Sequence, residues 1–236
     1  MKALILAAGM GTRISKHTNG KPKCLLEVNG STIIERQIKI LNNVGVPKED
    51  IIIVTGYKSN FITDLIGNEV KYIHNVNFEN TSSLYSMWLA KNEDYSNGML
   101  LFNSDLIFHE QILYKLVGQK GNAIAVDFNK NIKDGEMNVV IDKKNNIIEI
   151  SKEIDVTLAH GESVQICKFD KSSSSIIFEK VDQIVKENPS NSLFPAYAFK
   201  DVIDKKGIFA LDIGNYSWGE IDYLVDLEEV KQNNWS

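Results

Sequence analysis

Short apolar runs alternate with helical patterns along the first 120 residues of the chain. Residues 2–8 are almost entirely apolar, which is typical of a parallel strand buried on both faces. Residues 31–45 carry apolar side chains at 33, 34, 38 and 41, which is helical spacing, with Ser31 or Thr32 as the cap and Gly45 past the end. Similar patterns predict strands at 50–57, 70–75 and 98–108, and helices at 59–67, 81–92 and 109–119. The alternation predicts an α/β fold, a Rossmann-like and mostly parallel sheet with flanking helices.

The pattern changes from about residue 122. Four strand candidates follow one another quickly, at 122–128, 136–142, 146–154 and 163–169, and helical patterns return at 172–188 and 220–234. The interval 12–30 between the first strand and the first helix is a long loop, and long loops in compact domains are usually functional. We therefore expect one domain over 1–236, with an α/β part at 1–121 and a β-rich part at 122–236.

Composition and charge narrow the class of protein. A chain with 43% hydrophobic and 24% charged residues has the balance of an ordinary globular protein. Its net charge of −5 argues against a general nucleic-acid binder, and no apolar run approaches the ~20 residues that span a membrane. The two cysteines, Cys24 and Cys167, have no metal-ligand spacing and form no disulfide framework. We expect a cytoplasmic protein with neither a membrane nor a nucleic acid as partner.

The first strand runs into a glycine-rich turn in the stretch "LILAAGMGTR" at residues 4–13. Gly9 and Gly11 allow a sharp turn and the close approach of a ligand to backbone N–H groups, and Arg13 suits phosphate oxygens. A P-loop motif is absent, and a dinucleotide fingerprint would need glycine at position 14, where the chain has Ile14. Two alternatives remain open, a polyphosphate cradle or a solvated loop with an incidental turn. The cations of the loop are Arg13, Lys16, Lys21 and Lys23.

Two aspartates and one helix start are further candidates. Asp105 ends a buried strand, where it would either cap the next helix or bind a divalent metal. Asp222 stands beside Glu220 before the last helix, where it would either cap that helix or fold back as a second metal ligand. Residues 77–90 offer small polar groups followed by Tyr85 and Trp88, which form either a pocket wall or part of the core.

Five stretches in a fixed order now suggest a family. They are "LILAAGMGTR", "KPKCLLEVNG", "IIIVTGY", "FNSDLIF" and "GEIDYLVDLEEV", and together they resemble the nucleoside-triphosphate transferase family, the pyrophosphorylases that make nucleotide-activated sugars and alcohols. The resemblance implies a fold of the nucleotide-diphospho-sugar transferase type. It also implies Mg²⁺ as cofactor, held by Asp105 and Asp222, with Arg13 and Lys23 as catalytic residues. The nucleotide-binding residues that it implies are Leu6, Ala7, Ala8, Gly9, Gly11, Thr12, Arg13, Lys23 and Ser104.

Later segments resemble one branch of this family, the small-molecule cytidylyltransferases. This likeness implies CTP as one substrate and, as the other, phosphocholine, 2-aminoethylphosphonate or a phosphorylated amino acid or amide such as phosphoglutamine. It implies a nucleotide-binding part at 1–121 and an acceptor-binding part, with the second metal ligand, at 122–236. The implied acceptor-binding residues are Lys152, Tyr85, Trp88, Glu136 and Asp127.

One departure leaves the identity of the acceptor open. The branch often has Gly-Ile where this chain has Val164-Gln165-Ile166. A sugar-1-phosphate nucleotidyltransferase is the alternative enzyme, and a non-catalytic nucleotide-binding subunit is the alternative outside catalysis. The non-catalytic alternative conflicts with the presence of Arg13, Lys23 and both aspartates, because a chain that had lost its activity would be expected to lack some of them. The sequence is compatible with a homodimer.

Overall fold

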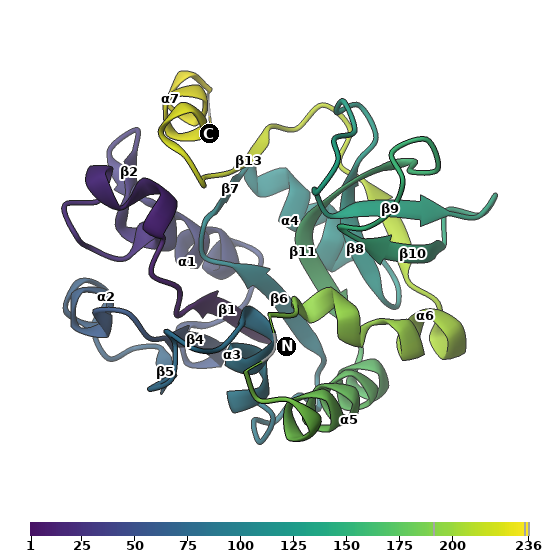
Figure 1. The fold of residues 1–236 in the computed structure, drawn as a ribbon, viewed down its shortest axis with the longest axis horizontal. Helices are drawn as coiled ribbons and strands as arrows, with labels where there is room; N and C mark the ends of the chain where they lie inside the picture. Colours follow the sequence, from purple (N-terminus) through teal and green to yellow (C-terminus); the bar gives the residue numbers. More distant parts are fainter. Residues whose placement is uncertain (191, 234, 236) are drawn as a thin grey trace.

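The computed structural model describes residues 1–190, 192–233 and 235. These residues contain a nine-stranded mixed sheet, in which β10, β9, β11, β6, β1, β4 and β5 are neighbours in that order and β8 joins β11 to β12 (Figure 1). The parallel part consists of β1 (Lys2–Ala7), β4 (Ile51–Thr55), β5 (Lys71–His74) and β6 (Met99–Asn103). The predicted α/β fold with a mostly parallel central sheet is confirmed.

Helices cover both faces of the parallel part, because β1, β4 and β6 are apolar on both faces. Ala3 and Ile5 of β1 belong to the same buried cluster as side chains of α1 (Ile33–Asn43), α2 (Ser59–Ile66) and α4 (Glu110–Gly118). Leu4 and Leu6 point to the opposite face. There they pack with side chains of α3 (Ser83–Leu89), α5 (Lys171–Glu187) and α6 (Lys200–Lys206).

The β-rich part continues the same sheet. Its strands are β8 (Ala123–Asp127), β9 (Asn138–Ile141), β10 (Ile147–Ser151), β11 (Gly161–Phe169) and β12 (Phe209–Asp212). The long strand β11 runs antiparallel to β6, β8 and β9, so it joins the two parts. The four strands expected from residue 122 onward are therefore present, whereas β12 and α6 were not predicted.

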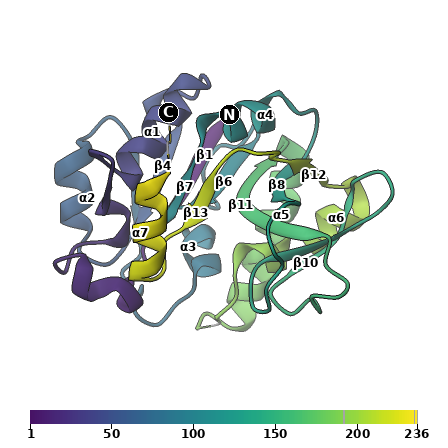
Figure 2. The ribbon, with the colours of Figure 1, turned by 90° about the horizontal axis from the view of Figure 1, so that it is seen from above.

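Three expected elements differ from those observed. The single strand expected at 98–108 is two strands, because the chain leaves the sheet at Ser104 and Asp105 before β7 (Leu106–Phe108). β7 pairs with β13 (Trp218–Glu220), which is why the last helix, α7 (Leu224–Gln232), begins later than residue 220 (Figure 2). The long loop contains the 3-10 helices η1 (Thr12–His17) and η2 (Lys23–Leu25) and ends in a hairpin of β2 (Glu27–Val28) and β3 (Ser31–Thr32). A fourth 3-10 helix, η4 (Pro195–Ala198), precedes α6, and η3 (Lys48–Asp50) precedes β4.

Two further sequence expectations can be compared with the structure. Thr32 caps α1 by accepting a hydrogen bond from the backbone N–H of Glu35, which decides between the two candidate caps. Among the described residues, none of the helices has the length and apolar character that a membrane crossing requires.

Candidate functional site

The glycine-rich turn lies at the carboxyl end of β1, beside the carboxyl end of β6. Gly11 has φ of +60°, a left-handed conformation that favours glycine. A Cβ atom on Gly11 would lie 3.0 Å from Cβ of Lys23, so the absence of a side chain also lets η2 approach the turn. Arg13 and Lys23 are brought to the same place in this way.

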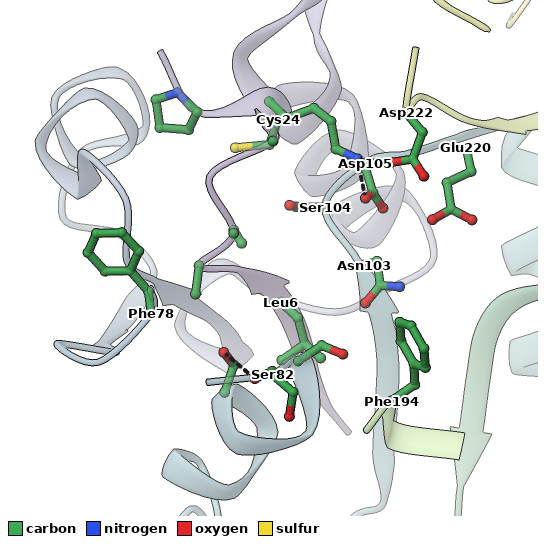
Figure 3. A pocket seen from close by; sticks show the side chains of 18 of the residues that line it. Leu6, Cys24, Phe78, Ser82, Asn103, Ser104, Asp105, Phe194, Glu220 and Asp222 are labelled. Carbon is green, nitrogen blue, oxygen red and sulfur yellow. Dashed lines mark hydrogen bonds and ion pairs between the residues drawn. The ribbon is translucent and has the colours of Figure 1, made fainter. Parts of the chain in front are cut away.

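The turn borders a pocket of about 300 Å³ (Figure 3). All nine predicted nucleotide-binding residues line it, and so do both predicted metal ligands and Lys152. Residues of α3 and the segment before it line the pocket as well, which places the small hydroxyl groups of the 77–90 segment in its wall. The lining residues to which the sequence assigned no individual binding role are Pro22, Cys24, Phe78, Thr81, Ser82, Ser83, Ser86, Asn103, Gln165, Phe194 and Glu220.

Lys23 joins the two aspartates. Its Nζ lies 2.7 Å from Oδ2 of Asp105 and 2.6 Å from Oδ1 of Asp222, and Arg13 forms a further ion pair with Asp222. Burial alone would lower the pKa of Lys23, but the charges of the two carboxylates outweigh burial and raise this pKa above its usual value. Burial opposes ionisation of Asp222, yet Lys23 and Arg13 hold the pKa of that carboxyl below its usual range. Asp222 is therefore held in its ionised form beside Lys23.

The helix-cap alternatives for these aspartates do not hold. His109 caps α4, and Tyr223 occupies the N-cap position of α7. The pairing of β7 with β13 brings Asp222 to Asp105, because Ile221 donates its backbone N–H to the carbonyl of Asp105 at 3.1 Å. Both carboxylates consequently face the pocket.

Glu220 adds a third carboxylate that sequence reasoning placed beside Asp222 but did not assign to the site. Its Oε2 accepts a hydrogen bond of 2.7 Å from Nε2 of Gln165. Burial raises the pKa of Glu220 to about 8, and the charges of Asp105 and Asp222 add to the effect. The spacing of two residues from Asp222 was the available signal, because alternate residues of an extended segment lie on one side.

The three carboxylates fit a divalent cation. Asp105, Glu220 and Asp222 each offer an oxygen atom, and these atoms lie within 4.8 Å of one another. Oδ1 of Asp105 is buried and, within the part of the chain that the structure describes, has no hydrogen-bond partner. An orphaned carboxylate oxygen beside two further carboxylates is suited to Mg²⁺, which prefers oxygen ligands.

Some predicted residues lie outside the pocket lining. Tyr85 and Trp88 pack against the cluster of buried residues under α3 and α5, and the Trp88 indole donates to Asp182. Asp127 accepts a hydrogen bond of 2.8 Å from the Trp218 indole, and Glu136 is likewise absent from the lining. Lys16 and Lys21 are exposed and do not line the pocket either. Tyr85 and Trp88 thus pack, partly buried, against this cluster and do not line the pocket.

Comparisons with known proteins identify the family of the chain. Residues 3–143 match the family described as the MobA-like NTP transferase domain. The bifunctional protein GlmU of Methanococcus aeolicus is 27% identical over 229 residues, which cover 96% of this chain and 53% of that protein. Choline-phosphate cytidylyltransferase of Streptococcus pneumoniae is 36% identical over 118 residues, which cover 49% of this chain and 47% of that protein. The matches thus span about half the length of these relatives.

A solved structure has the same fold. The CTP:phosphocholine cytidylyltransferase LicC of Streptococcus pneumoniae superposes with a TM-score of 0.78 and 22% identity, covering 98% of this chain and 97% of the other. The family match extends over more than half of the chain and includes the glycine-rich turn, Lys23 and Asp105. It confirms the resemblance expected from the sequence, and the chain belongs to the family of MobA-like NTP transferase domains.

Proposed function

We propose that the chain is a Mg²⁺-dependent cytidylyltransferase that joins CTP to a small phosphate or phosphonate monoester and releases pyrophosphate. The observation that carries this proposal is the position of Lys23, which pairs with both Asp105 and Asp222 at the edge of a pocket bordered by a glycine-rich turn. CTP and the class of acceptor are taken from the likeness to cytidylyltransferases.

The nucleotide occupies the end of the pocket formed by residues 6–13. Backbone N–H groups of the turn face the triphosphate, and Arg13 and Lys23 supply positive charge beside it. In this proposal Phe78 and the hydroxyl groups before α3, which line the same pocket, enclose the nucleoside. Phe78 and Ser82 are labelled in the view of the pocket (Figure 3). Residues 1–121 in this proposal form the nucleotide-binding part.

The acceptor occupies the other side of the carboxylates. Lys152, whose Nζ lies 4.9 Å from the centroid of the Phe194 ring, supplies a cation for the acceptor phosphate. Residues of 122–236 thus form the acceptor-binding part and contribute Glu220 and Asp222. Four further residues were expected to contact the acceptor, namely Tyr85, Trp88, Glu136 and Asp127. None of them lines the pocket, and their contacts with the acceptor stay predictions.

The reaction then requires positioning and charge neutralisation. An acceptor phosphate oxygen attacks the α-phosphorus of CTP in line, a new P–O bond forms, and the bond to the pyrophosphate oxygen breaks. Asp105 and Asp222, with Glu220 beside them, would hold Mg²⁺, which when bound neutralises phosphate charge. Arg13 and Lys23 stabilise the negative charge that grows on the departing pyrophosphate. No group of the chain needs to form a covalent intermediate.

A grid of substrates tests the proposal. Pyrophosphate release is measured with CTP, UTP, GTP, ATP or dTTP against phosphocholine, 2-aminoethylphosphonate, phosphorylated amino acids and amides, glycerol phosphate and several sugar 1-phosphates. Turnover that requires Mg²⁺, CTP and an aminated or amino-acid phosphate is the expected result. Turnover confined to the sugar phosphates would replace it with a sugar-1-phosphate nucleotidyltransferase, and absence of turnover throughout would refute it.

A further inference from the structure

Gln165 has a backbone conformation that is unusual for its position within a strand. Its φ is +61°, in the left-handed region that side chains other than glycine, asparagine and aspartate rarely adopt. The pairing of β11 with β8 shifts register between Ser163 and Cys167, so Gln165 lies in a bulge. Val164 and Ile166 on either side are completely buried and fix the bulge in place. Backbone strain of this kind persists where the surroundings enforce it, and it is frequent at functional sites.

The Gln165 side chain is held at both ends of its amide group. Oε1 accepts a hydrogen bond of 3.2 Å from Nδ2 of Asn103, and Nε2 donates to Oε2 of Glu220 at 2.7 Å. Asn103 ends β6 and Glu220 ends β13, so these bonds orient the amide toward the carboxylate side of the pocket. An amide has two N–H donors and two acceptor lone pairs. The bonds described use one of each, which leaves capacity for a polar ligand.

The amide also separates two cavities. Gln165, Asn103 and Phe194 line the main pocket and, on their other side, a smaller cavity of about 30 Å³. Asn103 and Phe194 lie on the side of the main pocket opposite Phe78 (Figure 3). The lining of the smaller cavity is otherwise mostly apolar and includes Leu101, Met137, Ile150, Cys167 and Phe199.

We propose that Gln165 determines acceptor specificity by forming the end wall of the acceptor side of the pocket. The inference rests on the proposed function and adds a selection rule to it. The amide offers a hydrogen bond to a small polar acceptor, and its bulk closes the smaller apolar cavity to larger acceptors. The positive φ, enforced by the bulge, directs the side chain to this wall rather than along the strand.

Gln165→Gly is the informative substitution, because glycine adopts a positive φ without strain while it removes the wall. Relief of the backbone strain and loss of the two amide hydrogen bonds oppose one another, so the variant should remain folded. Its KM for CTP should stay within about twofold of the wild-type value. We compare kcat/KM for the best small acceptor with kcat/KM for a bulkier one, such as a sugar 1-phosphate. The ratio of the two should fall about tenfold, which is the size of effect expected from the loss of one hydrogen bond or steric contact. Gln165→Asn tolerates a positive φ and retracts the amide by one methylene, so it should give an intermediate ratio.

Asn145→Gly is the matched control. Asn145 also has a φ of +61°, but it lies between β9 and β10 and does not line the pocket. This variant should leave the acceptor ratio unchanged. An unchanged ratio in both Gln165 variants, or an equal loss of kcat/KM for every acceptor, would overturn the specificity role while the proposed function stands. If the wild-type protein turns over no acceptor, the proposed function fails, and the selection rule fails with it.

Discussion

Glu220 makes the stability of the metal-free protein depend on pH in an unusual direction. Most carboxyl groups of folded proteins stabilise the fold when ionised, but burial raises the pKa of Glu220 from the usual 4.5 to about 8. Between these two values the folded protein binds more protons than the unfolded chain does. The free energy of unfolding contributed by Glu220 is therefore fully present below about pH 4.5 and is lost as the pH rises toward 8.

The size of this effect follows from the pKa difference. One pKa unit corresponds to about 1.36 kcal/mol, so the full difference between 4.5 and about 8 is worth about 5 kcal/mol. Glu220 borders the pocket, and water there screens part of the cost of ionisation. We expect about 2–3 kcal/mol of stability to be lost from this group between about pH 5 and pH 8.

Urea unfolding at a series of pH values, with a chelator present, measures this loss. Glu220→Gln is the matched variant, because its amide oxygen still accepts the hydrogen bond from Gln165 but does not titrate. The difference in stability between the two proteins should change by about 2–3 kcal/mol across the range. Added Mg²⁺ should flatten the wild-type curve, since a bound cation favours the ionised carboxylate. Parallel curves for the two proteins, without metal, would show that Glu220 ionises normally and would refute the reasoning.

Three further substitutions test the rest of the site. Asp105→Asn removes the charge of a proposed metal ligand and should cut turnover by at least about 100-fold, and near-normal pyrophosphate release would remove Asp105 from the metal site. Lys23→Ala should slow turnover to a similar extent with an unchanged circular dichroism spectrum, whereas an unfolded spectrum would make Lys23 structural. Gly56→Ala would place a Cβ 2.6 Å from the carbonyl oxygen of Ala8 and 2.7 Å from Cβ of Phe78. It should raise the KM for CTP about tenfold or more by displacing the turn, and an unchanged KM would place the nucleotide elsewhere.

The parts of the fold that could be predicted from the sequence are those set by local patterns. Neighbouring residues determine the apolar runs of β1 and β4 and the capped, amphipathic helix α1. The positions of these elements were therefore predicted closely. The glycine-rich turn and Lys23 also lie close together in the chain. Both line the pocket, and this could be predicted because the loop after the strand and turn only has to fold back toward the turn.

The remaining features depend on pairings between distant segments. β13 has three residues and becomes a strand only because it pairs with β7, more than a hundred residues earlier. That pairing brings Glu220 into the site. No local periodicity of the sequence indicates that β13 pairs with β7. The helix at 81–92 was predicted, but its pattern did not decide whether the hydroxyl side or Tyr85 and Trp88 would face the pocket. The choice follows from α5, which packs against α3 and provides Asp182 as the partner of Trp88.

The charge of the site explains why overall composition is a poor guide to its ligand. The charged residues that line the pocket are three cations and three carboxylates, namely Arg13, Lys23, Lys152, Asp105, Glu220 and Asp222. Burial raises the pKa of Glu220 to about 8, which favours its protonated form near neutral pH and shifts the balance of the lining toward positive charge in a chain of net charge −5. A polyanion such as a nucleoside triphosphate is thus attracted locally although the net charge of the chain is negative. Ionisation of Glu220 removes this positive charge and so weakens anion binding, whereas a Mg²⁺ ion held by the three carboxylates would restore it. The two proposed ligands, CTP and Mg²⁺, carry opposite charges and are for this reason expected to bind best together.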